Sequence, residues 1–276
     1  MSNSIHRLSR IHLFRPLSSA SPTSRPLFIF LPGMDGSGKL LARQLEGLET
    51  QFDVCCLSLP VNDLSSWPTL AMRAARLIAE ERDRTGQPVY ICAESFGGCL
   101  ALLVALRQPE LLHRLILINP ASSFSRLPWL QWGSMLAELL PSPVLPSSLY
   151  RLSAWGLEPF LINSERVTPE DRTLLLQTMQ SVHPRTAAWR LRLLRSFDLQ
   201  QEQLERLDLP VLLVAGERDR LLPSIDEVQR IAQRLPQHQT FFLPHSGHAC
   251  LLEKEVHLGE ILQRCGFWPQ QAQIQA

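Results

Sequence analysis

The 276-residue sequence lacks several patterns that would place it in other classes of protein. Lysine and arginine number 27 against 26 aspartates and glutamates, so there is no basic excess to attract nucleic acid. No apolar run reaches the roughly 18 residues of a membrane-spanning helix, and no signal-peptide core is present. The six cysteines lack the spacing of a disulfide or zinc framework, which indicates a reducing compartment. We therefore expect a soluble cytoplasmic protein with no metal, cofactor or nucleic-acid partner.

Acidic residues are also missing from the N-terminal part of the chain, where the first is Asp35. Residues 1–25 are rich in serine and arginine, a composition typical of an organelle transit peptide. The competing interpretation, which we favour, is an edge strand at residues 11–14 followed by a Ser/Pro-rich linker. The transit-peptide alternative would place the protein in an organelle such as a plastid.

Apolar runs of strand length alternate with helical patterns along much of the chain. Strands are expected at residues 27–31, 52–59, 88–92, 115–118, 209–216 and 240–243, and helices at 68–84 and 97–107. Such alternation predicts an α/β fold, a mostly parallel sheet flanked by helices. The length fits one domain with an insertion.

The most informative segment is Ala93-Glu94-Ser95-Phe96-Gly97-Gly98, which stands between an expected strand and an expected helix. A serine at such a corner is a candidate nucleophile, held in a strained turn that tolerates only small neighbours two residues away. Ala93 and Gly97 meet that demand. The alternative is an ordinary helix N-cap serine.

Two later segments supply an acid and a base in the order that a Ser–acid–His triad can take. Asp219 follows the expected strand at 209–216, at the end of the sheet where α/β folds place their sites. The alternative for Asp219 is a turn carboxylate paired with Arg218 or Arg220. His248 follows Gly247 and is expected to open the final helix, and His245 is its nearest rival. We predict the triad Ser95, Asp219 and His248.

A glycine-rich turn, Pro32-Gly33-Met34-Asp35-Gly36-Ser37-Gly38, follows the first buried strand and precedes an amphipathic helix with Leu41, Leu45 and Leu48. We predict that the backbone N–H groups of Met34 and Phe96 form an oxyanion hole beside Ser95. A phosphate-binding loop is the rival interpretation. It fails on spacing, because Lys39 is followed by leucine rather than serine or threonine.

These four segments resemble the α/β-hydrolase superfamily. Residues 31–38 and 94–98 are similar to the hydrolase part of phytyl ester synthase-like proteins of plastids and cyanobacteria, which make esters of long-chain alcohols and diacylglycerols by acyl transfer. Plant members add a second acyltransferase region with a His-x-x-x-x-Asp motif, and no histidine here has an aspartate five residues on. The resemblance implies an α/β-hydrolase fold and leaves both hydrolysis and acyl transfer open.

The superfamily commonly carries a helical cap where the alternation stops here. The resemblance therefore implies a cap, or lid, at residues 121–200, inserted in a core made of 26–120 and 201–276. Four of its apolar residues fall at helix-like spacings: Trp129, Trp132, Leu136 and Leu140. They are expected either to line an acyl-chain cleft or a membrane-facing surface, or to form the small core of the lid.

Together the residues predict a serine esterase, lipase or thioesterase that acts on a small apolar ester or thioester through an acyl-enzyme on Ser95. The first alternative is transfer of a fatty acyl group to a long-chain alcohol or diacylglycerol. A dehalogenase would need an aspartate in place of Ser95, and a non-catalytic binding protein would not need the triad. Peripheral membrane contact through the lid is a further expectation, and the sequence makes no prediction of the oligomeric state.

Overall fold

The computed structural model describes residues 10–16, 24–128, 156–199 and 201–269. Its centre is a seven-stranded sheet with the strand order β1-β3-β2-β4-β5-β6-β7. Neighbouring strands from β2 to β7 pair in parallel, and β1 pairs antiparallel with β3. The strands are β1 (His12–Phe14), β2 (Leu27–Leu31), β3 (Asp53–Ser58), β4 (Val89–Glu94), β5 (Arg114–Ile118), β6 (Val211–Gly216) and β7 (His238–Leu243). The predicted mostly parallel sheet is confirmed.

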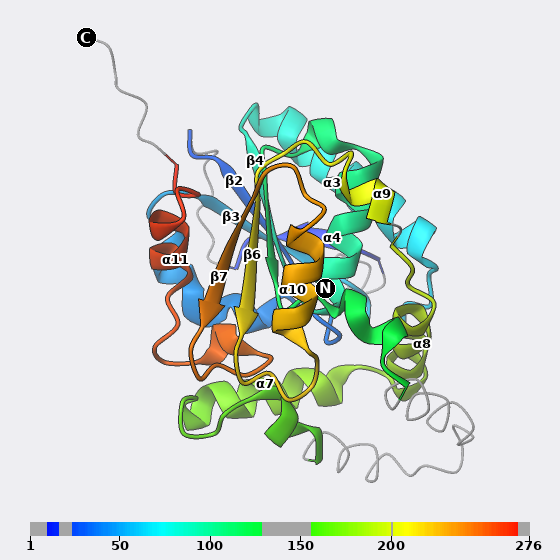
Figure 1. Ribbon diagram of the computed structural model, residues 1–276, viewed down its shortest axis with the longest axis vertical. Coiled ribbons are helices and arrows are strands. Elements are labelled where there is room, and N and C mark those ends of the chain that lie inside the picture. Colours follow the sequence, from blue (N-terminus) through cyan, green and yellow to red (C-terminus); the bar gives the residue numbers. More distant parts are fainter. Residues whose placement is uncertain (1–9, 17–23, 129–155, 200, 270–276) are drawn as a thin grey trace, which may run out of the picture.

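Helices cover both faces of this sheet (Figure 1). One face carries α3 (Trp67–Thr85), α4 (Phe96–Arg107) and α10 (Ser224–Ala232), and the other carries α2 (Leu45–Leu48) and α11 (Leu258–Arg264). Side chains of a strand point alternately to the two faces, and in β2 Ile29 faces the first layer while Phe28 and Phe30 face the second. Burial on both sides explains why the strand sequences are almost continuously apolar.

Two further helices, α7 (Pro169–Ser181) and α8 (Pro184–Arg195), come from the segment for which a cap was predicted. Figure 1 shows α7 lying across the end of the sheet to which the arrowheads of β6 and β7 point. The hydroxyl of Thr168 caps α7 by accepting a hydrogen bond from the Asp171 N–H at 3.1 Å. In the ranges that the structure describes, no helix is long and apolar enough to cross a membrane.

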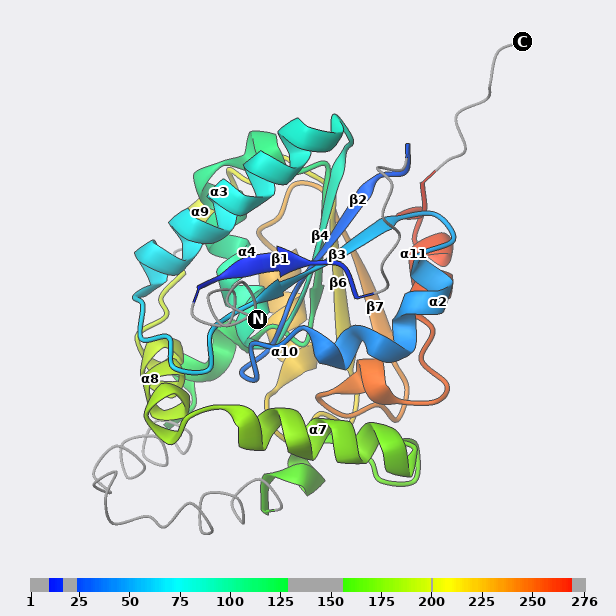
Figure 2. The ribbon, with the colours of Figure 1, turned by 180° about the vertical axis from the view of Figure 1, so that it is seen from behind.

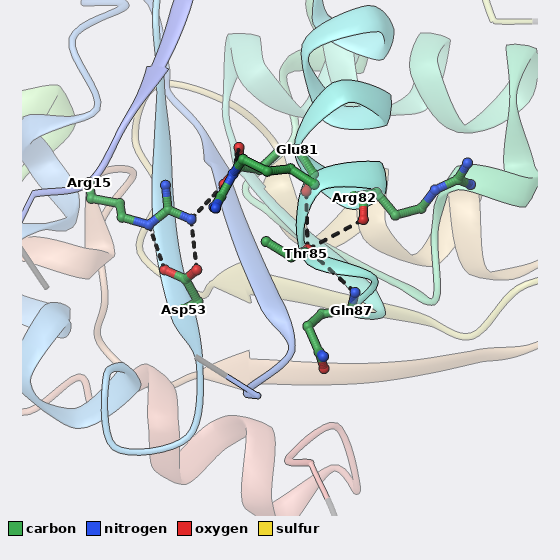
Figure 3. Close-up of polar contacts among 7 residues, drawn as sticks. Arg15, Asp53, Glu81, Arg82, Thr85 and Gln87 are labelled. Carbon is green, nitrogen blue, oxygen red and sulfur yellow. Dashed lines mark hydrogen bonds and ion pairs between the residues drawn. The ribbon is translucent and has the colours of Figure 1, made fainter. Parts of the chain in front are cut away.

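The N-terminal strand is tied to the rest of the fold by an arginine that follows it. Figure 3 shows Arg15 reaching two carboxylates from separate elements. Its guanidinium donates to both oxygens of Asp53 in β3, at 2.8 and 2.7 Å, and to Glu81 in α3 at 2.5 Å. The Asp53 side chain is almost fully buried, so its charge needs this planar two-bond partner. Figure 2, from behind, shows β1 at the edge of the sheet.

One expected helix takes a different form. The segment after the glycine-rich turn is a 3₁₀ helix, η1 (Lys39–Gln44), followed by the single α-helical turn α2. A 3₁₀ helix aligns residues three apart, so Leu41 and Gln44 share the inward side. The buried Gln44 amide then donates to the carbonyls of Leu251 and Val256, at 2.7 and 2.9 Å. The spacing of Leu41, Leu45 and Leu48 gave no indication that Gln44 would be buried and hydrogen-bonded.

All six cysteines are free thiols in buried positions. Burial raises the pKa of each thiol, to about 12 at Cys55. They belong to both packing layers, with Cys99 in α4 on one side of the sheet and Cys265 just beyond α11 on the other.

Candidate active site

Ser95 lies on the sharp turn between β4 and α4, with φ 54° and ψ −116°. A positive φ costs a residue other than glycine about 1–3 kcal/mol, so the surrounding structure must enforce it. The Ser95 N–H donates to the Ile118 carbonyl at 3.0 Å, and the Ser95 carbonyl accepts from the Ala121 N–H at 3.1 Å. At Gly97 a Cβ would lie 2.2 Å from the Leu31 carbonyl oxygen, so only glycine fits there.

The structure brings the three predicted catalytic residues together from the loops after β4, β6 and β7. His248 Nε2 lies 2.8 Å from Ser95 Oγ, and His248 Nδ1 lies 2.7 Å from Asp219 Oδ2. The side chains of His248 and Asp219 are 4% and 1% exposed, and Ser95 is 8% exposed. His245, the rival, is exposed and takes no part in these bonds. The geometry allows His248 to accept the serine proton while Asp219 holds the other ring nitrogen.

Asp219 is fixed by four donors. Its Oδ1 accepts from the backbone N–H groups of Leu221 and Leu222 at 2.8 and 2.9 Å, and its Oδ2 accepts from Ser224 Oγ at 2.5 Å as well as from His248. Burial alone would raise the pKa of Asp219, but attraction to His248 and these hydrogen bonds outweigh it and hold the pKa below its usual value. The carboxylate is therefore ionised at neutral pH.

The same pairing raises the pKa of His248. Burial lowers its pKa, but the charge of Asp219 and the hydrogen bond to it raise the pKa more, with a smaller contribution from Glu94. The net pKa of His248 lies above the ordinary histidine value of 6.5. A base of this strength is suited to taking a proton from a serine and returning it to a leaving group.

The loop that carries His248 differs from the expected helix start. His248 lies in a turn before the 3₁₀ helix η4 (Cys250–Leu252), and the final helix α11 begins only at Leu258. The reason is that Glu253, fully buried, accepts from Ser246 Oγ and the Gly247 N–H at 2.8 Å each. With these groups bonded to a side chain, the backbone does not need helical partners.

Glu253 also joins this loop to the predicted cap. Arg166 Nε donates to Glu253 Oε2 at 2.7 Å, and the Lys254 N–H donates to the Arg166 carbonyl at 2.8 Å. The Ala249 N–H donates to the Leu161 carbonyl, also at 2.8 Å. Segment 161–167 is thus bonded directly beside the histidine. Nothing in the local sequence indicated this long-range pairing.

Asn119 is a second residue that sequence reasoning missed. It is fully buried at the end of β5, with a positive φ of 43°. Its Oδ1 accepts from the Gly216 N–H at 2.8 Å, and its Nδ2 donates to the His248 carbonyl at 2.7 Å. One amide therefore links the strand that leads to Asp219 with the loop of the histidine. The sequence could have indicated Asn119, because this residue directly follows a buried strand at the site's end of the sheet.

The glycine-rich turn passes beside the nucleophile. A Cβ on Gly33 would lie 3.6 Å from Ser95 Cβ, and the Gly36 N–H closes the turn on the Gly33 carbonyl at 3.0 Å. Phe96 is the first residue of α4, and N–H groups in the first turn of a helix have no partner within it. Among the described residues, the Met34 N–H also has no hydrogen-bond partner. Both N–H groups are therefore available, at the two places where an oxyanion hole was predicted.

Glu94, beside the nucleophile, is a buried acid in an unusual state. It is 4% exposed, and within the described ranges its Oε1 has no hydrogen-bond partner. The pKa of Glu94 is raised to about 8, chiefly by burial. The charges of Asp35 and Asp219 also raise this pKa, and the charge of His248 lowers it. The side chain is therefore mostly protonated at neutral pH.

Trp129, Trp132, Leu136 and Leu140 lie outside the residues that the structure describes. Among those that it does describe, no group of three or more His, Cys, Asp or Glu side chains is placed to hold a metal ion.

Comparison with known proteins adds independent findings. The sequence profile of the alpha/beta hydrolase fold family matches residues 26–255. Phytyl ester synthase 1, chloroplastic, of Arabidopsis thaliana is 31% identical over 273 residues, which cover 92% of this chain and 39% of that protein. This chain thus spans about two fifths of the length of the phytyl ester synthases that it matches.

A shorter relative and a solved structure are also similar to this chain. A pimeloyl-[acyl-carrier protein] methyl ester esterase of Nitrosomonas europaea is 28% identical over 176 residues, covering 62% of this chain and 68% of that protein. The structure of MenH from S. aureus superposes with a TM-score of 0.75 at 17% identity, covering 94% of this chain and 97% of that one. At this identity, the structural likeness bears on the fold alone.

Proposed function

Since this chain belongs to the α/β-hydrolase fold family, we propose that it is a serine hydrolase that cleaves an apolar carboxylic ester or thioester through an acyl-enzyme on Ser95. The observation that carries the proposal is the unbroken chain of contacts from Ser95 Oγ through His248 to Asp219, at 2.8 and 2.7 Å. The contacts support an ester or thioester as the substrate, because each contact matches a step of acyl transfer to a serine.

In this mechanism, Ser95 Oγ attacks the carbonyl carbon as its proton passes to His248 Nε2. Asp219 stabilises the imidazolium that forms, and the N–H groups of Met34 and Phe96 donate to the oxyanion. When the tetrahedral intermediate collapses, His248 returns the proton to the leaving alcohol or thiol and the acyl-enzyme remains. Water, deprotonated by the same histidine, then releases the acid and restores Ser95.

A fluorophosphonate probe tests this proposal directly, because it reacts only with an activated serine. We expect labelling of the wild type, and its loss in Ser95→Ala and His248→Ala. His245→Ala is a matched control in the same loop, since His245 is exposed, and it should label like the wild type. A folded wild-type protein that does not react would contradict the proposal and favour a binding protein on this fold.

We further propose that residues 121–200 form a lid whose apolar residues select the acyl chain. Support comes from the position of α7 at the site's end of the sheet and from Trp129, Trp132, Leu136 and Leu140. Each methylene that enters an apolar cleft contributes about 0.8 kcal/mol. Polar substitutions at these four positions should therefore shift the preference from palmitoyl toward acetyl esters. Unchanged chain-length preference in folded variants would leave them as lid core only.

Acyl transfer to a long-chain alcohol or diacylglycerol is the second candidate. The match to phytyl ester synthase 1 over 92% of this chain favours it. Because water is the more abundant acceptor, transfer requires a site that excludes water and holds the alcohol oxygen near the acyl carbon. Incubation with an acyl donor and phytol or diacylglycerol distinguishes the two, and free acid as the sole product would leave a hydrolase.

A further inference from the structure

Arg190 is a buried cation that reaches from the predicted cap into the core. It lies in α8 and is 2% exposed. Its Nη1 donates to the Met34 carbonyl at 2.6 Å, and its Nη2 donates to the Pro60 carbonyl at 3.1 Å. These carbonyls belong to the loops that follow β2 and β3, which are neighbouring strands. One planar guanidinium thus joins two loops at the carboxyl edge of the sheet.

The glycine-rich turn is shaped to receive this guanidinium. A Cβ on Gly36 would lie 2.7 and 2.9 Å from the two terminal nitrogens of Arg190, and the φ of Gly36 is +69°. The Gly36 carbonyl also accepts from the Leu59 N–H at 2.8 Å. The turn is therefore held between Arg190 and the end of β3, in a conformation that favours glycine.

From these contacts we infer that Arg190 is a positioning residue for the oxyanion hole, an inference that rests on the proposed function. The residue whose carbonyl it holds, Met34, is the one whose N–H is proposed to receive the oxyanion. An oxyanion donor works only if it is fixed before charge develops, because reorganisation during the reaction would cost the energy that it supplies. Arg190 supplies that restraint without touching the substrate.

Two substitutions separate the effect of the planar, two-bond guanidinium of Arg190 from the effect of its positive charge. Arg190→Lys keeps a positive charge but cannot hold both carbonyls in one plane, and Arg190→Met removes charge and donors while keeping much of the apolar stem. We expect kcat to fall about 10- to 100-fold in Arg190→Met and by a smaller factor, still above about twofold, in Arg190→Lys, short of the roughly 10²- to 10³-fold that loss of a donor itself costs. KM should stay within about twofold, because the loss is confined to the transition state.

A matched pair of inhibitors shows whether the oxyanion is the group affected. A trifluoromethyl ketone adds Ser95 Oγ to its carbonyl and places a hemiketal oxyanion in the hole, whereas the methyl ketone of the same chain length only binds. Affinity for the first should fall in step with kcat, and affinity for the second should not change. Arg185→Met is the control, since Arg185 lies exposed in the same helix.

The outcomes are distinct. A folded Arg190→Met variant with kcat within about twofold of wild type, or one that loses affinity for both ketones equally, would overturn the inference alone. If Arg190→Met does not fold, Arg190→Lys decides by the same criteria. A wild type that neither reacts with a fluorophosphonate nor cleaves an ester would overturn the proposed function and this inference with it.

Discussion

Replacement of Asn119 by alanine should destabilise the fold and weaken the site together. The change leaves the Gly216 N–H and the His248 carbonyl without the partners that they have at 2.8 and 2.7 Å. An unsatisfied buried group costs about 1–3 kcal/mol, so the two together cost about 2–6 kcal/mol. Alanine also tolerates the φ of 43° less well than asparagine, which adds about 1 kcal/mol.

A loss of this size is a large part of the roughly 5–15 kcal/mol by which proteins are stable, so urea unfolding measures it readily. Asn163→Ala is a matched control, because within the described part of the chain that side chain accepts only a local hydrogen bond from the Glu165 N–H near the surface. It should cost less than about 1 kcal/mol. The Asn119→Ala variant should also hydrolyse esters more slowly than wild type at urea concentrations too low to unfold it. A loss of stability no larger than that of the control, with full activity, would refute the reasoning.

Three more predictions concern ionisable groups of the site. Asp219→Asn should lower kcat by about 10⁴-fold, because an amide cannot stabilise the imidazolium, and near-normal initial rates would show that another carboxylate serves. Since the pKa of His248 is raised above 6.5 and its neutral form is the base, initial rates should rise with pH along one limb centred above that value, and a flat profile from about pH 5 to 8 would contradict a histidine base. Glu94 binds its proton more tightly in the folded state, with a pKa of about 8 against 4.5, so its contribution to stability declines as pH rises through this window. Glu94→Gln should therefore gain stability over wild type between about pH 5 and 8 in urea unfolding, and a difference independent of pH would count against a buried acid.

The sheet could be predicted from the sequence because its strands are buried on both faces. The run at Leu27–Leu31 matches β2 residue for residue, and the run expected at 115–118 falls short of β5 by one residue. Ser95 and Asp219 were found because each lies in the turn or loop that follows such a strand, where neighbouring parallel strands bring their loops together. The position of these residues after the ends of buried strands was therefore the main basis for predicting the site.

The contacts that support the site were not predictable in this way. Arg190 acts on loops far from it in sequence, and Glu253 accepts from Gly247, six residues before it, in a loop that no periodic pattern marks. The wrong helix start at His248 has a related cause, because the side chain of Glu253, six residues after Gly247, bonds the backbone in place of helical partners. Asn119 is the exception, because its place at the end of a strand marks it.

The burial of all six cysteines gives this protein built-in reporters of its own motion. Thiols react as thiolates, and raised pKa values leave almost none at neutral pH, so an alkylating reagent modifies a cysteine only when its surroundings open. The rate of mass gain at each position therefore measures how often that part of the fold opens. Alkylation of Cys265 before Cys99 would mean that the C-terminal helix frays while the helix behind Ser95 stays closed.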